Sequence, residues 1–439
     1  MSDRPAARVA FTTLGCKVNQ SETDLLARQF QAAGYECVPH EEWADVYVVN
    51  TCTVTQVADK KSRQAIGQAR RANPDALVVA TGCYASIVGD ALAGERTMVV
   101  RNRDKERLVP LVEGRLQRTA PEQLYFADAE KYLDRQAGQE RTRAMVKAQD
   151  GCDSHCTYCI IPRARGRSRS VPPQDVIRRV RSLVREGHAE VVLTGVDLGS
   201  YGEDVDQYPD LGGVLERILA ETTVRRIRVS SLEPGDFDPA WLGLWHSPRL
   251  CRHLHVPLQS GSAGVLQRME RTYTPDQFAA MIEACRAAVP DITITSDVMV
   301  GFPGETAEEF DEGYHFIRRC GFDGMHVFKY SQRSGTRAAR LPDQVPEDTK
   351  SERSRLLRDE AVAGVTRLLA RSVGRSAAVA WESESDGIWR GLTDTNIRVY
   401  GIPDAVRSGG MSGVTLGTEF KDGLWSEAAQ VDIPLVAVS

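Results

Sequence analysis

Residues 149–162 read QDGCDSHCTYCIIP. Three cysteines occur in this stretch with the spacing Cys-x3-Cys-x2-Cys, namely Cys152, Cys156 and Cys159. A structural zinc site usually needs four ligands, and the neighbouring cysteines Cys83 and Cys251 belong to no paired motif. Three thiolates suffice to hold three irons of a 4Fe–4S cluster and leave the fourth iron open to a ligand. The spacing therefore favours an iron–sulfur cluster with an open iron over a zinc site or a group of inert thiols.

The chain around and after this stretch alternates between strand and helix patterns. Strands are expected at residues 143–147, 190–194, 226–230, 253–256, 293–300 and 325–330. Helices are expected at residues 173–186, 211–221, 275–289, 305–320 and 347–372. Six strands in this order are typical of a partial parallel (β/α) barrel of the TIM type, which is predicted over residues 141–370. The active site of such a barrel lies at the C-terminal ends of its strands, and the cysteine stretch directly follows the first of them.

The first 120 residues show the same alternation. Apolar strand patterns at 9–14, 46–50, 76–81 and 98–101 alternate with helix patterns at 21–33, 57–72 and 105–115. This predicts an α/β fold, with a Rossmann-like parallel-sheet domain over residues 1–120. Residues 121–140 are polar and irregular and are interpreted as a linker.

Each of the first three strands of this domain is followed by a cysteine. They are Cys16, Cys52 and Cys83, 36 and 31 residues apart. Because the C-terminal ends of parallel strands meet at one edge of a sheet, the three thiols could converge there on a second cluster. Gly15 and Gly82 precede two of them and would let the backbone approach that cluster closely. Spacing alone leaves buried, unliganded thiols as an equal alternative.

The last part of the chain, residues 371–439, differs in composition from the rest. Short runs rich in Val, Trp and Thr alternate with glycine-containing turns, and the last run is AAQVDIP at 428–434. This pattern predicts a small antiparallel β domain. Its aromatic residues Trp381, Trp389 and Tyr400 could stack on nucleic-acid bases. A core role is favoured, because so small a domain needs aromatic side chains inside.

The composition is that of a soluble globular protein. The 439 residues are 42% hydrophobic and 26% charged and carry a net charge of −5, so RNA binding would depend on local basic patches. We find neither a signal-peptide pattern nor an apolar run long enough to span a membrane, which predicts a cytoplasmic protein without membrane association. The ten cysteines of a cytoplasmic chain are more often metal ligands or buried thiols than disulfides.

The cysteine stretch after the first barrel strand resembles the radical S-adenosylmethionine (SAM) superfamily. In that superfamily the open iron chelates the amino and carboxylate groups of SAM, which is then cleaved to a 5′-deoxyadenosyl radical. The resemblance implies that Cys152, Cys156 and Cys159 are the catalytic residues that hold this cluster.

Three further segments resemble the N-terminal domain of methylthiotransferases: TLGCKVNQSE (13–22), VNTCTV (49–54) and TGCYA (81–85). Proteins of this family have that domain, then a radical SAM barrel, then a small β domain called TRAM. The resemblance implies that Cys16, Cys52 and Cys83 hold an auxiliary 4Fe–4S cluster whose open iron carries the sulfur to be inserted. It also implies two SAM molecules per turnover, one for the methyl group and one for the radical.

On this resemblance we expect a transferase that adds a methylthio group to C2 of an adenine in transfer RNA (tRNA). TLGCKVNQ and VNTCTVT are most similar to the branch acting on N6-threonylcarbamoyladenosine at position 37. Sister branches act on isopentenyladenosine in tRNA and on an aspartate of a small-subunit ribosomal protein, and the acidic tail of this chain keeps the latter open. An RNA-binding protein with structural zinc is a non-enzymatic alternative. The expected reaction also needs a flavodoxin-like or ferredoxin-like electron donor and a sulfur source.

Four residues at or just after barrel strands resemble positions that line the SAM pocket of this family: Gly195, Glu233, Gln259 and Asp297. Polar side chains there could accept hydrogen bonds from a ribose, and a glycine would let the backbone approach an adenine. The alternative is that these residues are helix caps or turn residues.

A run of basic residues, RARGRSRS at 163–170, follows the cysteine stretch and contains Arg163, Arg165, Arg167 and Arg169. A charge run is usually a solvated face. Next to the expected active site of a negatively charged protein, phosphate contact is the better prediction. Alternate residues of an extended segment point to one side, so these arginines could face RNA together.

Overall fold

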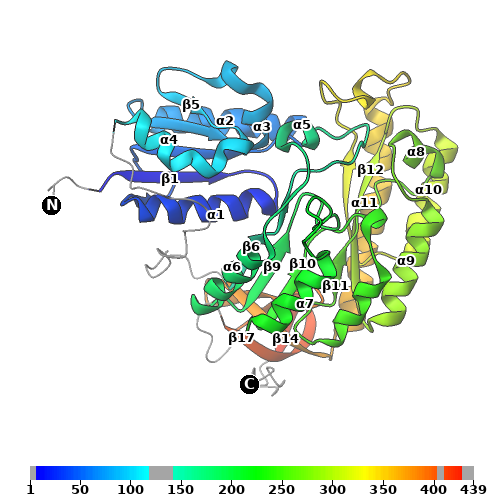
Figure 1. The fold of residues 1–439 in the computed structure, drawn as a ribbon. Helices are drawn as coiled ribbons and strands as arrows, with labels where there is room; N and C mark the ends of the chain where they lie inside the picture. The colour runs from blue at the N-terminus through cyan, green and yellow to red at the C-terminus, as the bar shows by residue number, and fades with distance from the viewer. Residues whose placement is uncertain (1–5, 118–141, 403–409, 428–439) are drawn as a thin grey trace.

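The computed structural model of the chain describes residues 6–117, 142–402 and 410–427. A parallel sheet with helices, a partial barrel and a small closed β barrel follow one another along the chain (Figure 1). The predicted linker at 121–140 and the last predicted strand of the tail, 428–434, lie outside the described residues. Among the helices in the described ranges, none has both the length and the apolar character that crossing a membrane requires.

The N-terminal sheet has five parallel strands in the order β2-β1-β3-β4-β5. The strands are β1 (Arg8–Thr13), β2 (Glu36–Val38), β3 (Val46–Thr51), β4 (Leu77–Thr81) and β5 (Thr97–Val99). The helices are α1 (Lys17–Ala32), α2 (Gln56–Ala72), α3 (Gly82–Val88) and α4 (Leu108–Arg115). Val48 packs in one apolar cluster with Phe30 of α1, and the next residue, Val49, packs in another with Ile66 of α2. Both faces are therefore covered, which is why β3 reads as a continuous apolar run.

The partial barrel consists of two three-stranded parallel sheets, β6-β9-β10 and β11-β12-β13. Its strands are β6 (Arg143–Lys147), β9 (Glu190–Thr194), β10 (Arg226–Val229), β11 (His253–His255), β12 (Thr293–Val300) and β13 (Gly324–Lys329). Its helices are α6 (Pro173–Arg185), α7 (Leu211–Glu221), α8 (Ala263–Arg268), α9 (Pro275–Ala288), α10 (Ala307–Cys320) and α11 (Glu347–Ser372). A bridge between Ser231 and His255 joins the two sheets, so the strands follow one another in chain order. The predicted α/β fold with six parallel barrel strands is confirmed.

The cysteine stretch forms a loop that is closed at its base. β7 (Gln149–Asp150) pairs with β8 (Arg169–Ser170), so the cysteines lie within one loop after β6. The segment expected to be extended begins within the short helix α5 (Ile161–Arg165), which ends at Gly166 with a φ of +82°, and only its end forms a strand, β8. A helix turns its side chains by about 100° per residue, so Arg163 and Arg165 do not alternate as residues of a strand do. The continuous extended arrangement that we predicted for the four arginines is therefore wrong.

The C-terminal part is a closed barrel in the order β14-β15-β16-β18-β17. The strands are β14 (Ser376–Ser385), β15 (Ile388–Thr393), β16 (Arg398–Gly401), β17 (Met411–Phe420) and β18 (Gly423–Glu427). They pair antiparallel as predicted, except that β16 and β18 are parallel. Trp381 and Tyr400 are buried and Trp389 packs against the barrel core, as the favoured interpretation predicts.

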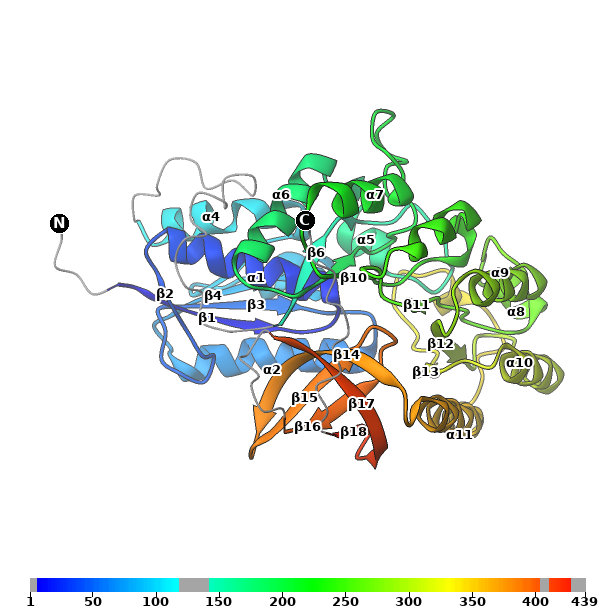
Figure 2. The ribbon, with the colours of Figure 1, turned by 90° about the horizontal axis from the view of Figure 1, so that it is seen from below.

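The C-terminal barrel docks at the strand starts of the partial barrel (Figure 2). Glu190, the first residue of β9, accepts hydrogen bonds from Arg226 at 2.6 Å and Arg228 at 2.8 Å. The same two guanidinium groups donate to the carbonyl oxygens of Leu392 and Thr393. A buried acid therefore holds two arginines in the orientation that joins the two barrels.

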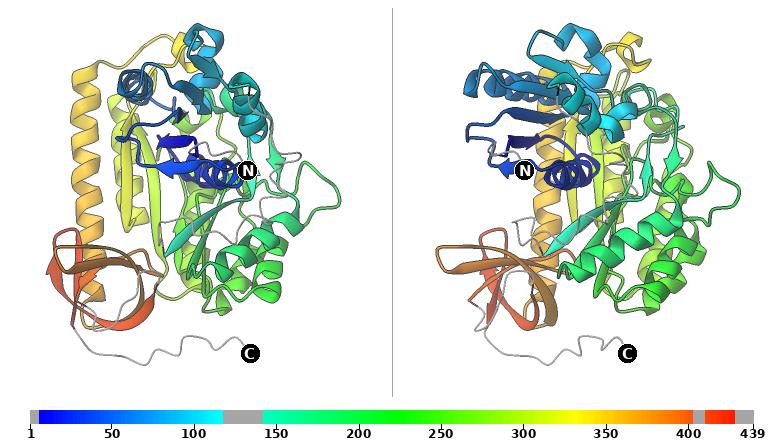
Figure 3. Two further views of the ribbon diagram at one scale, coloured as in Figure 1. Left: turned by 90° about the vertical axis from the view of Figure 1, so that its left-hand side faces the viewer. Right: turned by 60° about the vertical axis from the view of Figure 1, so that its left-hand side comes forward.

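The N-terminal sheet lies against the open side of the partial barrel, between β6 and β13 (Figure 3). On the β6 side, the Ser21 hydroxyl of α1 donates to the carbonyl oxygen of Met145 at 3.2 Å. On the β13 side, Arg333 donates to the Thr53 hydroxyl and to the Asp59 carboxylate, both at 2.7 Å. The sheet is thus anchored at both edges of the gap that the six strands leave.

Candidate active site

The three dispersed cysteines lie at one edge of the N-terminal sheet. Cys16 caps the start of α1 just after β1, Cys52 directly follows β3, and Cys83 is the second residue of α3 just after β4. Strands β1, β3 and β4 are neighbours in the sheet. The edge is that of the C-terminal strand ends, where open α/β sheets bind ligands.

Two glycines let these segments approach one another. Gly15 has a φ of +97°, and a Cβ there would lie 2.8 Å from the sulfur of Cys52. Gly82 has a φ of +91°, and a Cβ there would lie 2.3 Å from the carbonyl oxygen of Thr51. Only glycine adopts such backbone angles without strain and leaves that space. The two glycines thus allow close contact with Cys52 and Thr51, and their approach to a cluster stays a prediction.

Burial governs the acidity of the Cys52 and Cys83 thiols. Burial raises the pKa of Cys52, and neighbouring Cys83 and Cys16 raise it further. Burial also raises the pKa of Cys83, while the guanidinium of Arg165 opposes that rise. Since iron binds the thiolate, loading this site must release protons. Three thiols within electrostatic reach of one another, with a buried cation beside them, suit an iron–sulfur cluster.

The compact cysteine loop lies at the C-terminal end of β6. The amide of Cys159 donates to the carbonyl oxygen of Cys156 at 3.1 Å, and the amide of Cys152 donates to Gly166 at 3.2 Å. Burial raises the pKa of Cys159 to about 12 and that of Cys152 further still. These thiols too must lose protons when metal binds.

Charged side chains surround this loop. The Asp197 carboxylate lies 3.2 Å from the sulfur of Cys152, and Arg271 Nη1 lies 3.1 Å from the sulfur of Cys156. Nη2 of Arg271 pairs with the carboxylate of Glu233. Burial and the adjacent Asp197 raise the pKa of Asp236 to about 7. Asp197, a hydrogen-bond acceptor, and Arg271, a donor, thus lie beside the sulfurs of the loop. Binding a polar cofactor beside a cluster requires such groups.

The four residues predicted to line a SAM pocket all lie at C-terminal strand ends or on the strand beside them. Gly195 follows β9 and packs against Gln149, whose Oε1 accepts from the next two amides at 2.9 Å. Asp297 lies on β12, with Oδ1 3.3 Å from Nε2 of His255. Gln259 has a φ of +63° and bridges to β12 through its backbone. Arg271 contacts both Glu233 and Cys156 and so links the two residues. Contact between SAM and any of the four predicted residues stays a prediction.

The arginines after the loop separate into two groups. Arg165 is 3% exposed and bonded to Glu22 and Asp150, so the prediction that it contacts RNA is wrong. The side chain of Arg167 is 91% exposed and that of Arg169 is 52% exposed. Arg163 donates to the carbonyl oxygen of Ser334 at 3.4 Å. These three remain candidates for phosphate contact.

Sequence reasoning missed several residues of the site, among them Arg271, Asp236, His255 and Gln149. Arg271 lies after α8, far in sequence from the cysteines it approaches. Its segment, MERTY, carries no motif that indicates a ligand role. Gln149 could have been noticed, because it lies two residues after the end of β6, and polar residues just past a barrel strand lie on the active face.

No set of three or more His, Cys, Asp or Glu side chains in the described ranges is close enough to hold a single metal ion. A depression of about 320 Å³ lies at the opposite ends of β12 and β13, lined by Arg286, Asp291, Asp323 and Arg371 among others. None of the cysteines at either site lines it. This depression is therefore separate from both sets of cysteines.

Family models match two parts of the chain. Residues 8–101 match the uncharacterized protein family UPF0004, and residues 146–317 match the radical SAM superfamily. The first match contains the three dispersed cysteines, and the second contains the compact loop.

Solved structures share the fold at low sequence identity. The radical SAM methyltransferase TsrM from Kitasatospora setae superposes with a TM-score of 0.56 at 16% identity, covering 76% of this chain and 77% of that one. The cobalamin-dependent radical enzyme OxsB superposes with a TM-score of 0.51 at 12% identity, covering 82% and 56%. At these identities the likeness shows the fold alone.

Curated relatives are much more similar in sequence. The threonylcarbamoyladenosine tRNA methylthiotransferase MtaB of Bacillus subtilis is 45% identical, covering 79% of this chain and 78% of that one. MtaB of Aquifex aeolicus is 40% identical, covering 80% and 87%. The tRNA-2-methylthio-N(6)-dimethylallyladenosine synthase of Moorella thermoacetica is 34% identical, covering 79% and 80%. With both sets of cysteines in place on this fold, the chain belongs to the family of radical SAM tRNA methylthiotransferases.

Proposed function

We propose that this protein converts N6-threonylcarbamoyladenosine at position 37 of tRNA into its 2-methylthio derivative. The observation that carries the proposal is the pair of cysteine sets, one on the N-terminal sheet edge and one on the barrel face that meets it. The relatives named for this substrate are 45% and 40% identical, against 34% for the dimethylallyladenosine synthase. That ranking favours the threonylcarbamoyl branch.

The proposal assigns one 4Fe–4S cluster to each set. Cys152, Cys156 and Cys159 would hold the cluster that binds SAM, and the N-terminal set would hold the auxiliary cluster. With SAM bound, the first cluster supplies the radical that removes hydrogen from a C–H bond with no acidic proton. Side chains of the protein need only bind and orient the reactants and exclude water.

Residues around the compact loop have roles that follow from their contacts. Gln149 fixes the turn after Gly195 by accepting from two successive amides. Burial raises the pKa of Glu233, and Arg271 opposes the rise. The resulting ion pair presents a fixed carboxylate beside Cys156, where a ribose hydroxyl or an amino group can donate to it. Asp197 and Asp236 offer further acceptors beside Cys152.

The proposal also names partners and a compartment. The reaction needs a flavodoxin-like or ferredoxin-like electron donor, a sulfur source and two SAM molecules per turnover. The tRNA is expected to meet the exposed guanidinium groups of Arg167 and Arg169 and that of Arg163. We place the protein in the cytoplasm, where tRNA is modified, with the C-terminal barrel as a TRAM-like domain on residues 371–439.

The test is nucleoside mass spectrometry of total tRNA from cells with and without the gene. We expect the deletion to remove the methylthio form of threonylcarbamoyladenosine and the unmodified parent to accumulate. Re-expression of the wild-type chain should restore it, whereas Cys16→Ala and Cys156→Ala variants should not. Cys285→Ala, which changes a buried thiol outside both sets, is the matched control and should restore it.

Other outcomes would overturn the assignment. Loss of the methylthio form of isopentenyladenosine instead would move the protein to the sister tRNA branch. Unchanged nucleosides with loss of a modified ribosomal-protein aspartate would exclude tRNA as the substrate. Colourless protein with stoichiometric zinc after anaerobic purification would exclude radical chemistry.

A further inference from the structure

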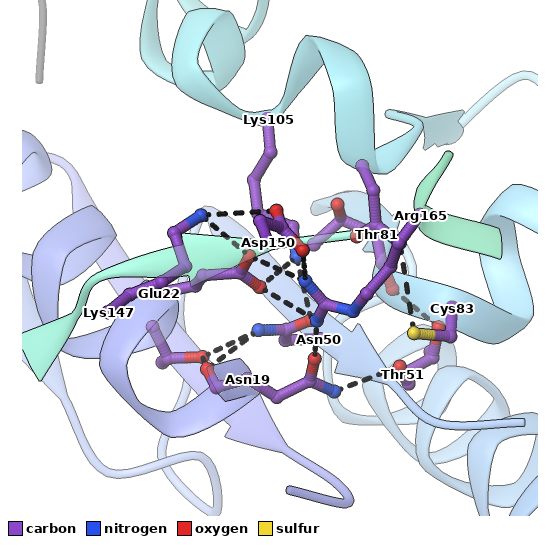
Figure 4. Close-up of polar contacts among 12 residues, drawn as sticks. Asn19, Glu22, Asn50, Thr51, Thr81, Cys83, Lys105, Lys147, Asp150 and Arg165 are labelled. Atoms are coloured by element: carbon purple, nitrogen blue, oxygen red, sulfur yellow. Dashed lines mark hydrogen bonds and ion pairs between the residues drawn. The ribbon is translucent and has the colours of Figure 1, made fainter. Parts of the chain in front are cut away.

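Five ionisable side chains meet in the interior between the N-terminal sheet and the cysteine loop (Figure 4). They are Glu22 of α1, Lys105 of the 3-10 helix Asn102–Arg107, Lys147 of β6, Asp150 of β7 and Arg165 of α5. All but Lys147 are less than 9% exposed. Charged side chains are almost never buried unless paired, so this cluster needs a physical reason.

Arg165 lies at the centre of the cluster. Its Nη1 donates to Asp150 at 2.6 Å and to Glu22 at 3.0 Å, and its Nη2 donates to Asn19 at 2.5 Å. Lys105 donates to the second oxygen of Glu22 at 2.5 Å. Burial alone would raise the pKa of Glu22, but Arg165 and Lys105 hold it well below its usual range.

The cluster combines three basic side chains, Lys105, Lys147 and Arg165, with two carboxylates. Burial lowers the pKa of Lys105, although Glu22 opposes that fall. Arg165 is the member that stays charged in any protein environment. Its charge is buried, where an opposite charge nearby is strongly favoured.

That interior adjoins the auxiliary cysteines. Asn102 donates from one amide nitrogen to the sulfur of Cys83 at 3.8 Å and to the carbonyl oxygen of Ala164 at 2.9 Å. Ala164 directly precedes Arg165, so the arginine is held beside the thiol. Figure 4 shows Arg165 and Cys83 in this same interior.

Arg165 is also close in sequence to the compact cysteine set. It lies six residues after Cys159, in the helix that directly follows the compact loop. The Arg165 guanidinium therefore connects the segment after the compact loop to helix α1, whose N-terminal cap is Cys16. No surface role explains a group that is 3% exposed.

We propose that Arg165 is a positioning residue for the auxiliary cluster, which locks the cysteine loop onto the N-terminal sheet and raises the reduction potential of that cluster. This inference rests on the proposed function, because it needs a cluster at Cys16, Cys52 and Cys83. Three thiolates make the site negative, and reduction adds a further negative charge. A buried cation beside the ligands stabilises the reduced form more than the oxidised form.

The test uses a chain in which Cys152, Cys156 and Cys159 are all replaced by Ala, so that only the auxiliary cluster is reconstituted. Iron content and the midpoint potential, followed by electron paramagnetic resonance during redox titration, are the readouts. Arg165→Gln should shift the midpoint to more negative potential, and Arg165→Lys, which keeps the charge, should shift it less. Arg167→Gln, an exposed arginine two residues away, is the control and should leave it unchanged.

Glu22→Gln gives a second, opposite test. It removes a negative charge from the same cluster and should shift the midpoint to more positive potential. A role in packing alone would not produce shifts of opposite sign. This variant also keeps the proposal falsifiable if Arg165→Gln fails to fold, because it leaves Arg165 with Asp150 as its partner.

The outcomes separate this inference from the proposed function. A bound cluster with the wild-type midpoint in Arg165→Gln, or with no positive shift in Glu22→Gln, would overturn the role of Arg165 and leave the proposed function intact. A triple-alanine chain that binds no iron would overturn both, because the auxiliary cluster itself would be missing.

Discussion

Gly82 has a conformation and surroundings that admit no side chain. Its φ is +91°, and a Cβ would lie 2.3 Å from the oxygen and 2.5 Å from the nitrogen of Thr51. These are backbone atoms of β3 and cannot rotate away. We expect Gly82→Ala to lower the free energy of unfolding by about 4 kcal/mol. It should also halve the iron bound after reconstitution, because Cys83 would be displaced.

The control for this prediction is Gly34→Ala, measured by urea unfolding and iron analysis on the same preparations. Gly34 has a φ of +86° but no atom within 4 Å of an added Cβ. Its substitution should cost about 1 kcal/mol and leave the iron content unchanged. Equal losses for the two variants would show that the backbone angle, and not the contact with Thr51, is what matters.

Glu233 tests the predicted contact with SAM beside the compact loop. It is paired with Arg271, which also touches Cys156. A hydrogen bond to a charged group contributes about 1.5–3 kcal/mol, so Glu233→Gln should weaken SAM binding by roughly ten- to hundredfold. Anaerobic equilibrium dialysis measures this, with Glu283→Gln on α9 as the exposed control. Unchanged affinity in Glu233→Gln would remove this residue from the SAM pocket.

At the scale of elements, Glu190 joins β9 and β10 to the C-terminal barrel. Burial alone would raise its pKa, but Arg226 and Arg228 hold the pKa at about 2, below the ordinary value of 4.5. A depressed pKa contributes stability that is complete above the unfolded value and is lost as pH falls through the folded value. The difference corresponds to about 3 kcal/mol, lost between about pH 5 and pH 2.

Glu190→Gln should therefore lower the free energy of unfolding at pH 7 by about 3–5 kcal/mol, because two buried arginines lose their partner. Its stability should also decline less on acidification than that of the wild type. Urea unfolding between pH 7 and pH 3 tests both statements. Glu216→Gln on α7, where the side chain is exposed, is the control. A parallel acid dependence in wild type and Glu190→Gln would contradict the assignment.

At the scale of the whole molecule, the N-terminal sheet is anchored at both edges of the open barrel. Arg333→Ala removes the anchor on the β13 side, formed with Thr53 and Asp59. We expect faster amide hydrogen exchange in residues 52–59 and a roughly tenfold fall in turnover, because small displacements at a reacting centre are costly. SAM affinity should not change, since the compact loop is untouched. Arg319→Ala on α10 should match the wild type in all three measurements.

Most of this architecture was predictable because its signals are regular. Apolar runs such as 46–50 and 76–81, each followed by a helix pattern, indicate parallel strands, and parallel strands bring Cys52 and Cys83 to one edge. The three-residue strand β2 was missed, because so short a segment carries no periodicity. The parallel pairing of β16 and β18 was missed for another reason, since pairing direction depends on the closure of the barrel.

The functional residues that stayed hidden are those whose partners are distant in sequence. Arg165 stands in a basic run that resembles a surface, and its burial depends on Glu22, which is 143 residues away. Arg271 reaches Cys156 across 115 residues. Spacing reveals ligands that are close in the chain or follow equivalent strands, but ion pairs between separate elements follow from the tertiary packing.

The two cysteine sets also differ in how much of the chain must fold before their thiols come together. Cys152, Cys156 and Cys159 lie within one loop, so a nascent or unfolded chain can bring them together at little entropic cost. Cys16, Cys52 and Cys83 come from three separate crossovers and meet only after β1, β3 and β4 have paired. On the proposed assignment, metal binding at the second set would therefore require the folded sheet. Iron at the dispersed set would then report a completed fold of the N-terminal domain, whereas iron at the loop would not.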